Sequence, residues 1–221
     1  MEELVATSVG DVSVVVDGTV TDDVLILAHG AGAGMHHPFM ERVAHSLAAG
    51  DIAVARFNFV YAQQGRKAPD RQAILEETYS AVVDRVRSRL SPRRLFLGGK
   101  SMGGRIATHL SATGETCDGV VLLGYPLHPP GRPERIRDAH LYELNVPILL
   151  VEGTRDPFCP LVTLERVRSK MKAPTSLLVI EGGDHAFNVR RSSGRTTDDA
   201  LAELVAGVRC WIAELPGVTG A

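Results

Sequence analysis

The sequence predicts an α/β fold, in which a mostly parallel central sheet has helices on both faces. Six short runs of almost purely apolar residues recur along the chain, a pattern typical of strands buried on both faces of a parallel sheet. Most of these runs are separated by stretches with helical spacing, as expected for helices that connect parallel strands. The sequence has no internal repeat, low-complexity tract or linker, so we expect a single domain over residues 1–221.

The apolar runs give the expected strands in chain order. They are VLILA (24–28), IAVARF (52–57), RLFLG (94–98), GVVLLG (119–124), PILLVEG (147–153) and SLLVIEG (176–182). An earlier run, VSVVVDG (12–18), alternates less clearly, and we expect it to be an antiparallel strand at the sheet edge.

Five stretches predict helices: 38–49, 70–90, 102–112, 160–171 and 198–215. In the second of them apolar residues step by three or four positions from Leu75 to Leu90, with charged residues on the other side. Ligands of such folds bind beyond the carboxyl ends of the strands. Functional residues should therefore follow the apolar runs directly.

Composition and charge exclude several classes of function. A net charge of −2 and an isoelectric point near 6.4 give no reason to expect nucleic acid or an anionic membrane as a partner. No stretch has the length of a signal peptide core or a membrane span. The sequence has three cysteines, Cys117, Cys159 and Cys210, an odd number without the spacing of a metal site. We therefore expect reduced thiols and a cytoplasmic location. We expect no metal or cofactor. The sequence assigns no oligomeric state.

The stretch LFLGGKSMGGRIA (95–107) begins as an apolar run and breaks into glycines around Ser101. Residues 99–103, GKSMG, fit the pattern G-x-S-x-G. By itself the pattern is also that of a glycine-rich turn. Its position between a buried strand and a helix favours a nucleophile elbow, in which a serine sits on a sharp, strained bend and glycines avoid clashes beside it.

A serine hydroxyl is a weak nucleophile that needs a base, usually a histidine oriented by a carboxylate. Both partners follow expected strands, because Asp156 comes just after PILLVEG and His185 just after SLLVIEGG. The chain order Ser101, Asp156, His185 is the one expected for a nucleophile elbow. We therefore predict that these three residues form a catalytic triad.

Rival candidates are less well placed along the chain. Asp184 is adjacent to His185 and cannot easily reach its ring, so we expect Asp184 to turn the loop. The remaining histidines lie in or near the first helix, inside the helix after the serine, or before the candidate acid; they are His36, His37, His45, His109, His128 and His140.

Two backbone N–H groups are needed to stabilise the oxyanion. Met102, just after the serine, supplies one, and the small-residue loop HGAGAG (29–34) should supply the other. We predict Ala31 as that second donor, with Gly32 as the alternative. A phosphate-binding loop is the competing interpretation, but neither G-x-G-x-x-G nor a following Gly-Lys-Ser/Thr is present.

Polar and basic residues cluster after the second of the apolar runs: Arg56, Asn58, Tyr61, Gln63, Gln64, Arg66 and Lys67. The cluster predicts either a solvated loop or a wall that recognises an acidic or polar group of the substrate. On the second interpretation the candidate substrate-binding residues are Arg56 and Tyr61, together with Gly32. If Lys100 packs backwards into the fold, its charge needs a buried partner.

The motifs HGAGAG, GGKSMGG, GTRDPF and GGDHAF, in this order and at these strand ends, resemble those of the α/β-hydrolase superfamily. They are most similar to small hydrolases related to dienelactone hydrolase and to the testis-expressed and KANSL-type hydrolase-like proteins. The resemblance runs from about Leu25 to His185, includes FNFVYAQQGRKAPDR, and implies the same triad. Dienelactone hydrolase has a cysteine nucleophile where this chain has Ser101, so its substrate is not carried over.

Larger relatives insert a helical cap after the sixth strand. Here only residues 127–146 precede the next strand, so we expect a minimal α/β-hydrolase fold without a cap domain and an open, shallow site. The function expected from these features is a serine hydrolase that cleaves a small ester or thioester. Two alternatives are a catalytically silent binding or assembly module, as for some KANSL-type relatives, and an acyltransferase or perhydrolase with the same triad.

Overall fold

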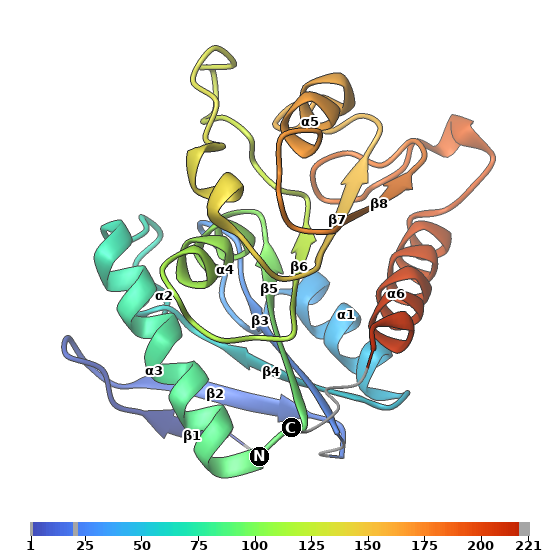
Figure 1. The fold of residues 1–221 in the computed structure, drawn as a ribbon. Helices are drawn as coiled ribbons and strands as arrows, with labels where there is room; N and C mark the ends of the chain where they lie inside the picture. The colour runs from blue at the N-terminus through green and yellow to red at the C-terminus, as the bar shows by residue number, and fades with distance from the viewer. Residues whose placement is uncertain (1, 20–21, 217–221) are drawn as a thin grey trace.

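The structure, a computed structural model, describes residues 2–19 and 22–216 (Figure 1). Within these ranges one sheet of eight strands has the order β1-β2-β4-β3-β5-β6-β7-β8. The strands are β1 (Glu2–Val5), β2 (Val12–Asp17), β3 (Asp23–Ala28), β4 (Ile52–Phe57), β5 (Arg94–Lys100), β6 (Gly119–Leu123), β7 (Ile148–Gly153) and β8 (Thr175–Ile180). All pairs from β4 to β8 are parallel, whereas β2 pairs antiparallel with both β1 and β4.

Helices cover both faces of this sheet (Figure 1). One face carries α3 (Gln72–Leu90), α4 (Met102–Ala112) and α5 (Leu161–Arg168), and the other carries α1 (Pro38–Ala48) and α6 (Thr197–Glu214). Shorter elements are α2 (Val60–Gln63) and two 3₁₀ turns, η1 (Ala139–Glu143) and η2 (Arg191–Ser193). The predicted α/β class, with helices on both faces of a mostly parallel sheet, is confirmed.

The apolar runs are continuous because each central strand contributes to two cores. In β3, Ile26 packs under α3 and α4, whereas its neighbours Leu25 and Leu27 pack under α1 and α6. All three side chains are fully buried. Alternate side chains of a strand point to opposite faces, so a strand covered on both faces is apolar at every position.

Two expectations about elements need correction. Residues 12–17 do form an antiparallel strand, but β2 is not at the edge, because β1 pairs along its outer side. The helix expected over 160–171 is shorter, since α5 ends at Arg168. Between β6 and β7 the structure has η1 and irregular backbone and no cap domain, as expected.

The order of the strands determines where the site forms. Strands β3, β5, β6, β7 and β8 are successive neighbours and all point the same way. The loops that follow β3, β5, β7 and β8 therefore emerge at one edge of the sheet. These loops contain the four motifs singled out in the sequence.

Candidate active site

Ser101 lies on the sharp turn between β5 and α4. Its backbone is in the positive-φ region, with φ 53° and ψ −114°, which few residues other than glycine adopt. The backbone N–H of Ser101 donates to the carbonyl of Leu123 at 3.0 Å, which attaches the turn to the end of β6. The strained conformation expected for a nucleophile elbow is therefore present.

Glycines are required around this turn because the start of α4 lies against the backbone at the ends of β3 and β5. A methyl carbon on Gly99 would lie 2.5 Å from the carbonyl carbon of Gly103 and 2.7 Å from the carbonyl oxygen of Ala28. One on Gly103 would collide with the end of β3. The glycines on both sides of Ser101 thus let α4 begin directly against the ends of β3 and β5.

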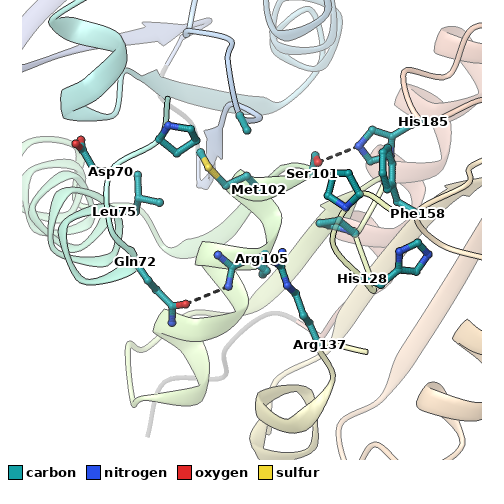
Figure 2. Close-up of a pocket in the computed structure, with 14 residues that line it drawn as sticks. Asp70, Gln72, Leu75, Ser101, Met102, Arg105, His128, Arg137, Phe158 and His185 are labelled. Atoms are coloured by element: carbon teal, nitrogen blue, oxygen red, sulfur yellow. Dashed lines mark hydrogen bonds between the residues drawn. The ribbon is translucent and has the colours of Figure 1, made fainter. Parts of the chain in front are cut away.

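His185 lies between Ser101 and Asp156, and Figure 2 shows its contact with Ser101. Its Nε2 is 2.9 Å from Ser101 Oγ, and its Nδ1 is 2.6 Å from Asp156 Oδ2. The carboxylate is fully buried, and its second oxygen accepts a hydrogen bond from the backbone N–H of Phe158 at 2.8 Å. The structure therefore brings the three sequence-predicted residues into one continuous chain of hydrogen bonds.

Asp184 does not join this chain of hydrogen bonds. Its Oδ1 accepts from the backbone N–H groups of Ala186 and Asn188, at 2.8 and 2.9 Å. These bonds turn the loop that presents His185, as expected for an aspartate at this place. The ring of Phe158 packs edge-on against the His185 ring, with centroids 4.7 Å apart, and restricts its rotation.

Ala31 and Met102, the predicted oxyanion donors, both line a hollow that also contains Ser101 and His185. Met102 is the first residue of α4, where backbone N–H groups have no partner within the helix. Among the described residues neither of these two N–H groups donates a hydrogen bond to the protein. Both are free to bind an oxygen atom of a ligand.

Two buried side chains brace the loop that contains Ala31. His29 Nδ1 lies 2.8 Å from the carbonyl of Gly30, and His29 Nε2 accepts from the backbone N–H of Phe59 at 3.2 Å. Burial lowers the pKa of His29 to about 4, so the ring is neutral at pH 7. The Tyr61 hydroxyl donates to the same carbonyl at 3.3 Å.

The three candidate substrate-binding residues do not line the hollows at Ser101. Arg56 is buried on β4, where its guanidinium binds Asp17 at 2.6 and 3.0 Å and the carbonyl of Met35. Tyr61 is fully buried beneath the loop, and burial raises its pKa to about 12, opposed by a backbone hydrogen bond from Gly32. The expected contact of these three residues with substrate is therefore not found. Arg56 and Tyr61 hold β4 and the loop after β3 instead, and Gly32 lies in that loop outside both hollows.

Two open hollows meet at Ser101. One, of about 280 Å³, extends between α3, α4 and the loop after β6 and contains Arg105 and Arg137 (Figure 2). The other, of about 410 Å³, extends towards α1 and contains Phe39 and Met40. They share Ser101, His185, Ala31 and Phe158. A small molecule with its reacting centre at Ser101 has room for one substituent on each side.

The Lys100 side chain points back into the protein, behind the hydrogen bonds that join Asp156, His185 and Ser101. Its Nζ has no hydrogen-bond partner among the described residues and lies 5.6 Å from the centroid of the Phe187 ring. Burial lowers the pKa of Lys100 to about 8, and the charges of Glu152, Asp156 and Asp184 oppose that shift. Burial, followed by the charge of Asp156, raises the pKa of Glu152 well above its usual range.

Two classes of site are not found in the part of the chain that the structure describes. No group of three or more His, Cys, Asp or Glu residues there is arranged to hold a metal ion. No helix in residues 2–19 or 22–216 has the length and apolar character needed to cross a membrane.

Residues 21–213 match the family described as the alpha/beta hydrolase domain, and the chain belongs to that family. Among curated proteins it is similar to YfhR, an uncharacterised protein of Escherichia coli K12. The two are 27% identical over 188 residues, which cover 75% of this chain and 64% of YfhR. The chain thus spans just under two thirds of this relative.

Solved structures share the fold at low sequence identity. One is XC6422 from Xanthomonas campestris, described as an α/β serine hydrolase without a lid, with a TM-score of 0.76 and 21% identity over 96% of this chain and 94% of that one. Another is dienelactone hydrolase from Anabaena variabilis, with a TM-score of 0.74 and 18% identity over 97% and 98% of the two chains.

Replacing Lys100 with methionine should make the protein more stable at pH 7. The pKa of Lys100 is about 8 in the folded protein against a usual value of 10.5, so the unfolded chain holds more protons between those values. The free energy of unfolding of the wild type therefore rises with pH across this window. We expect the Lys100→Met variant to melt several degrees above wild type at pH 7, with the difference narrowing towards pH 10.

Thermal unfolding followed by circular dichroism at both pH values measures this effect. The exposed Lys172 provides a matched control, since Lys172→Met removes an equivalent charge from the surface and should change Tm little. A Lys100→Met variant that melts below wild type at pH 7 would contradict a net cost of burying this ammonium.

Proposed function

We propose that this protein is a serine hydrolase that cleaves a small ester or thioester through an acyl-enzyme on Ser101. The observation that carries the proposal is the chain of hydrogen bonds from buried Asp156 through His185 to Ser101, with distances of 2.6 and 2.9 Å. This arrangement lets a histidine remove the serine proton while a carboxylate fixes its tautomer.

The reaction follows from these contacts. Asp156 accepts a hydrogen bond from the Nδ1–H group of His185, so Nε2 has a free lone pair directed at Ser101 Oγ. As Oγ attacks the ester carbonyl, Nε2 takes its proton, and the N–H groups of Ala31 and Met102 bind the oxygen that becomes negative. The imidazolium then gives its proton to the departing alcohol or thiol, which leaves an acyl group on Oγ.

Water completes the cycle by the same steps. It loses a proton to His185 Nε2 as its oxygen attacks the acyl carbonyl, and the second tetrahedral intermediate releases a carboxylic acid when Oγ regains the proton. The start of α4 lies directly beneath the oxyanion, and the positive end of a helix dipole favours negative charge at that position.

Small esters fit the site better than peptides. The hollows of about 280 and 410 Å³ accommodate one substituent each and do not form an extended groove. Ester and thioester leaving groups also need less protonation than amides.

Ser101→Ala should lower kcat for 4-nitrophenyl esters by about 10⁴- to 10⁶-fold, since only binding and the oxyanion donors remain. Alanine is smaller than serine and leaves the flanking glycines intact, so circular dichroism should show an unchanged fold. Ser111→Ala, on the last turn of the same helix, is the matched control and should retain activity. Activity of Ser101→Ala within tenfold of wild type would exclude Ser101 as the nucleophile.

The two neighbouring carboxylates should respond very differently to the same change. Asp156→Asn keeps the shape but presents an amide that favours the wrong tautomer of His185, and kcat should fall by up to about 10⁴-fold. Asp184→Asn weakens only the bonds that turn the loop, and we expect a loss of about tenfold. Parallel kinetics on the two purified variants decide between them, and the reverse order of effects would reject Asp156 as the acid.

A further inference from the structure

Two arginine side chains lie together in the smaller hollow beside Ser101. Arg105 is one turn further along α4, because its backbone N–H donates to the carbonyl of Ser101 at 3.1 Å. Arg137 comes from the loop between β6 and β7, and both residues line the hollow that contains Ser101 and His185. Figure 2 shows the two guanidinium ends close together on the same side of the serine.

Neither guanidinium is paired with a carboxylate. Arg105 Nη1 donates to neutral groups, Gln72 Oε1 at 3.1 Å and His109 Nε2 at 3.2 Å. The Arg137 side chain is exposed and has no hydrogen bond or ion pair with any described residue. Arg56 and Arg94, by contrast, each bind an aspartate through two nitrogens.

The carboxylates around the hollow form no ion pair with either arginine in the part of the chain that the structure describes. Asp70 lines the hollow, where its Oδ1 binds Arg66 at 2.7 Å and its Oδ2 is buried without a hydrogen-bond partner among the described residues. Glu76 accepts a hydrogen bond from the Gln72 amide at 2.7 Å, and Asp138 accepts one from a tyrosine hydroxyl. Two positive charges therefore face the hollow, and neither forms an ion pair with a described carboxylate, although Asp70 lines the same hollow. Burial, followed by the charge of Arg137, lowers the pKa of Arg105, as expected for like charges held near each other.

The surroundings hold Arg105 in position. The His109 ring, which accepts its hydrogen bond, stacks on the His140 ring with centroids 3.7 Å apart. Burial lowers the pKa of His140 to about 3 and also lowers that of His109, so both rings stay neutral and accept hydrogen bonds at pH 7. On its other side, Gln72 links Arg105 to Glu76.

The backbone of Arg137 is anchored as well. Its N–H donates to the carbonyl of Leu127 at 2.7 Å, and its carbonyl accepts from the Tyr125 hydroxyl at 3.4 Å. An exposed side chain on a fixed backbone can move onto a ligand without rearranging the loop. Two guanidinium groups that form no ion pair with a described carboxylate, beside the proposed nucleophile, match the planar oxygens of a carboxylate.

We infer that Arg105 and Arg137 form a carboxylate-binding subsite, and that the ester cleaved at Ser101 carries a free carboxylate on one side of its scissile bond. The inference rests on the proposed ester hydrolysis and adds its substrate class. The second hollow, with Phe39 and Met40, then receives the uncharged part of the substrate. The products are one molecule that keeps the original carboxylate and one released from the apolar side.

Two pairs of synthetic esters test this subsite. Mono-4-nitrophenyl adipate and its methyl ester place a carboxylate or a neutral group on the acyl side, and 4-acetoxybenzoate and 4-acetoxybenzamide do the same on the leaving side. We expect wild type to favour the charged member of one pair by at least about tenfold in kcat/KM, the size of a charge-assisted contact. Added salt should reduce this preference.

Variants attribute the preference to the two arginines. Arg105→Gln/Arg137→Gln should bring the charged-to-neutral ratio of kcat/KM close to one, and the ratio cancels any general effect on the triad. Arg137→Gln alone changes only an exposed side chain and should lower the ratio several-fold even if the double variant folds poorly. Arg132→Gln, in the same loop but outside the hollow, is the matched control and should keep the wild-type ratio.

The outcomes separate the subsite from the proposed function. Wild type that cleaves the neutral esters with a ratio near one for both pairs overturns the subsite and leaves ester hydrolysis intact. A preference that survives in Arg137→Gln and in the double variant also overturns the subsite. Absence of cleavage for all four esters overturns the proposed function and the subsite with it.

Discussion

The site depends on the close backbone contact between the start of α4 and the ends of β3 and β5. A methyl group on Gly99 or Gly103 would clash with backbone atoms, so only glycines let the helix begin directly against the sheet. Ser101 connects β5 to α4 at this contact with a positive φ. The same contact places the free N–H of Met102 beside the loop of Ala31. The same backbone contact therefore positions both the proposed nucleophile and the proposed oxyanion donors.

A second close contact brings Asp156 and His185, the proposed acid and base, together. A methyl carbon on Gly153 would collide with the carbonyl of Gly183, so the loops after β7 and β8 pack directly on each other. The N–H of Arg155 donates to that same carbonyl at 2.9 Å. Behind these loops the protein buries Lys100 near Asp156 at a cost in stability. The strained backbone of Ser101 and the unpaired ammonium of Lys100 are adjacent in the chain, and folding alone favours neither.

The parts of the fold that follow from local pattern were predictable. Strands buried on two faces are apolar throughout, so they can be recognised in the sequence. Residues that follow parallel strands lie together at the carboxyl edge of the sheet, and the positions of Ser101, Asp156 and His185 could therefore be predicted. Arg56 also lies at the end of an apolar run, which is why the sequence suggested a contact with substrate. It binds Asp17 instead, on an antiparallel strand 39 positions away, and no local sequence pattern predicts such a pair. Arg137 lies in an irregular loop, where sequence has no periodicity to interpret.

Activation of Ser101 by His185 can be measured with a mechanism-based label that reacts only with an activated serine. Purified protein is incubated with a fluorophosphonate, digested and analysed by tandem mass spectrometry, with His185→Ala treated in parallel. We expect one phosphonyl adduct, on the peptide that contains Ser101, which forms rapidly in wild type and at least about 10³-fold more slowly in His185→Ala. No adduct on wild type, an adduct on another residue, or equal labelling of the two proteins would contradict it.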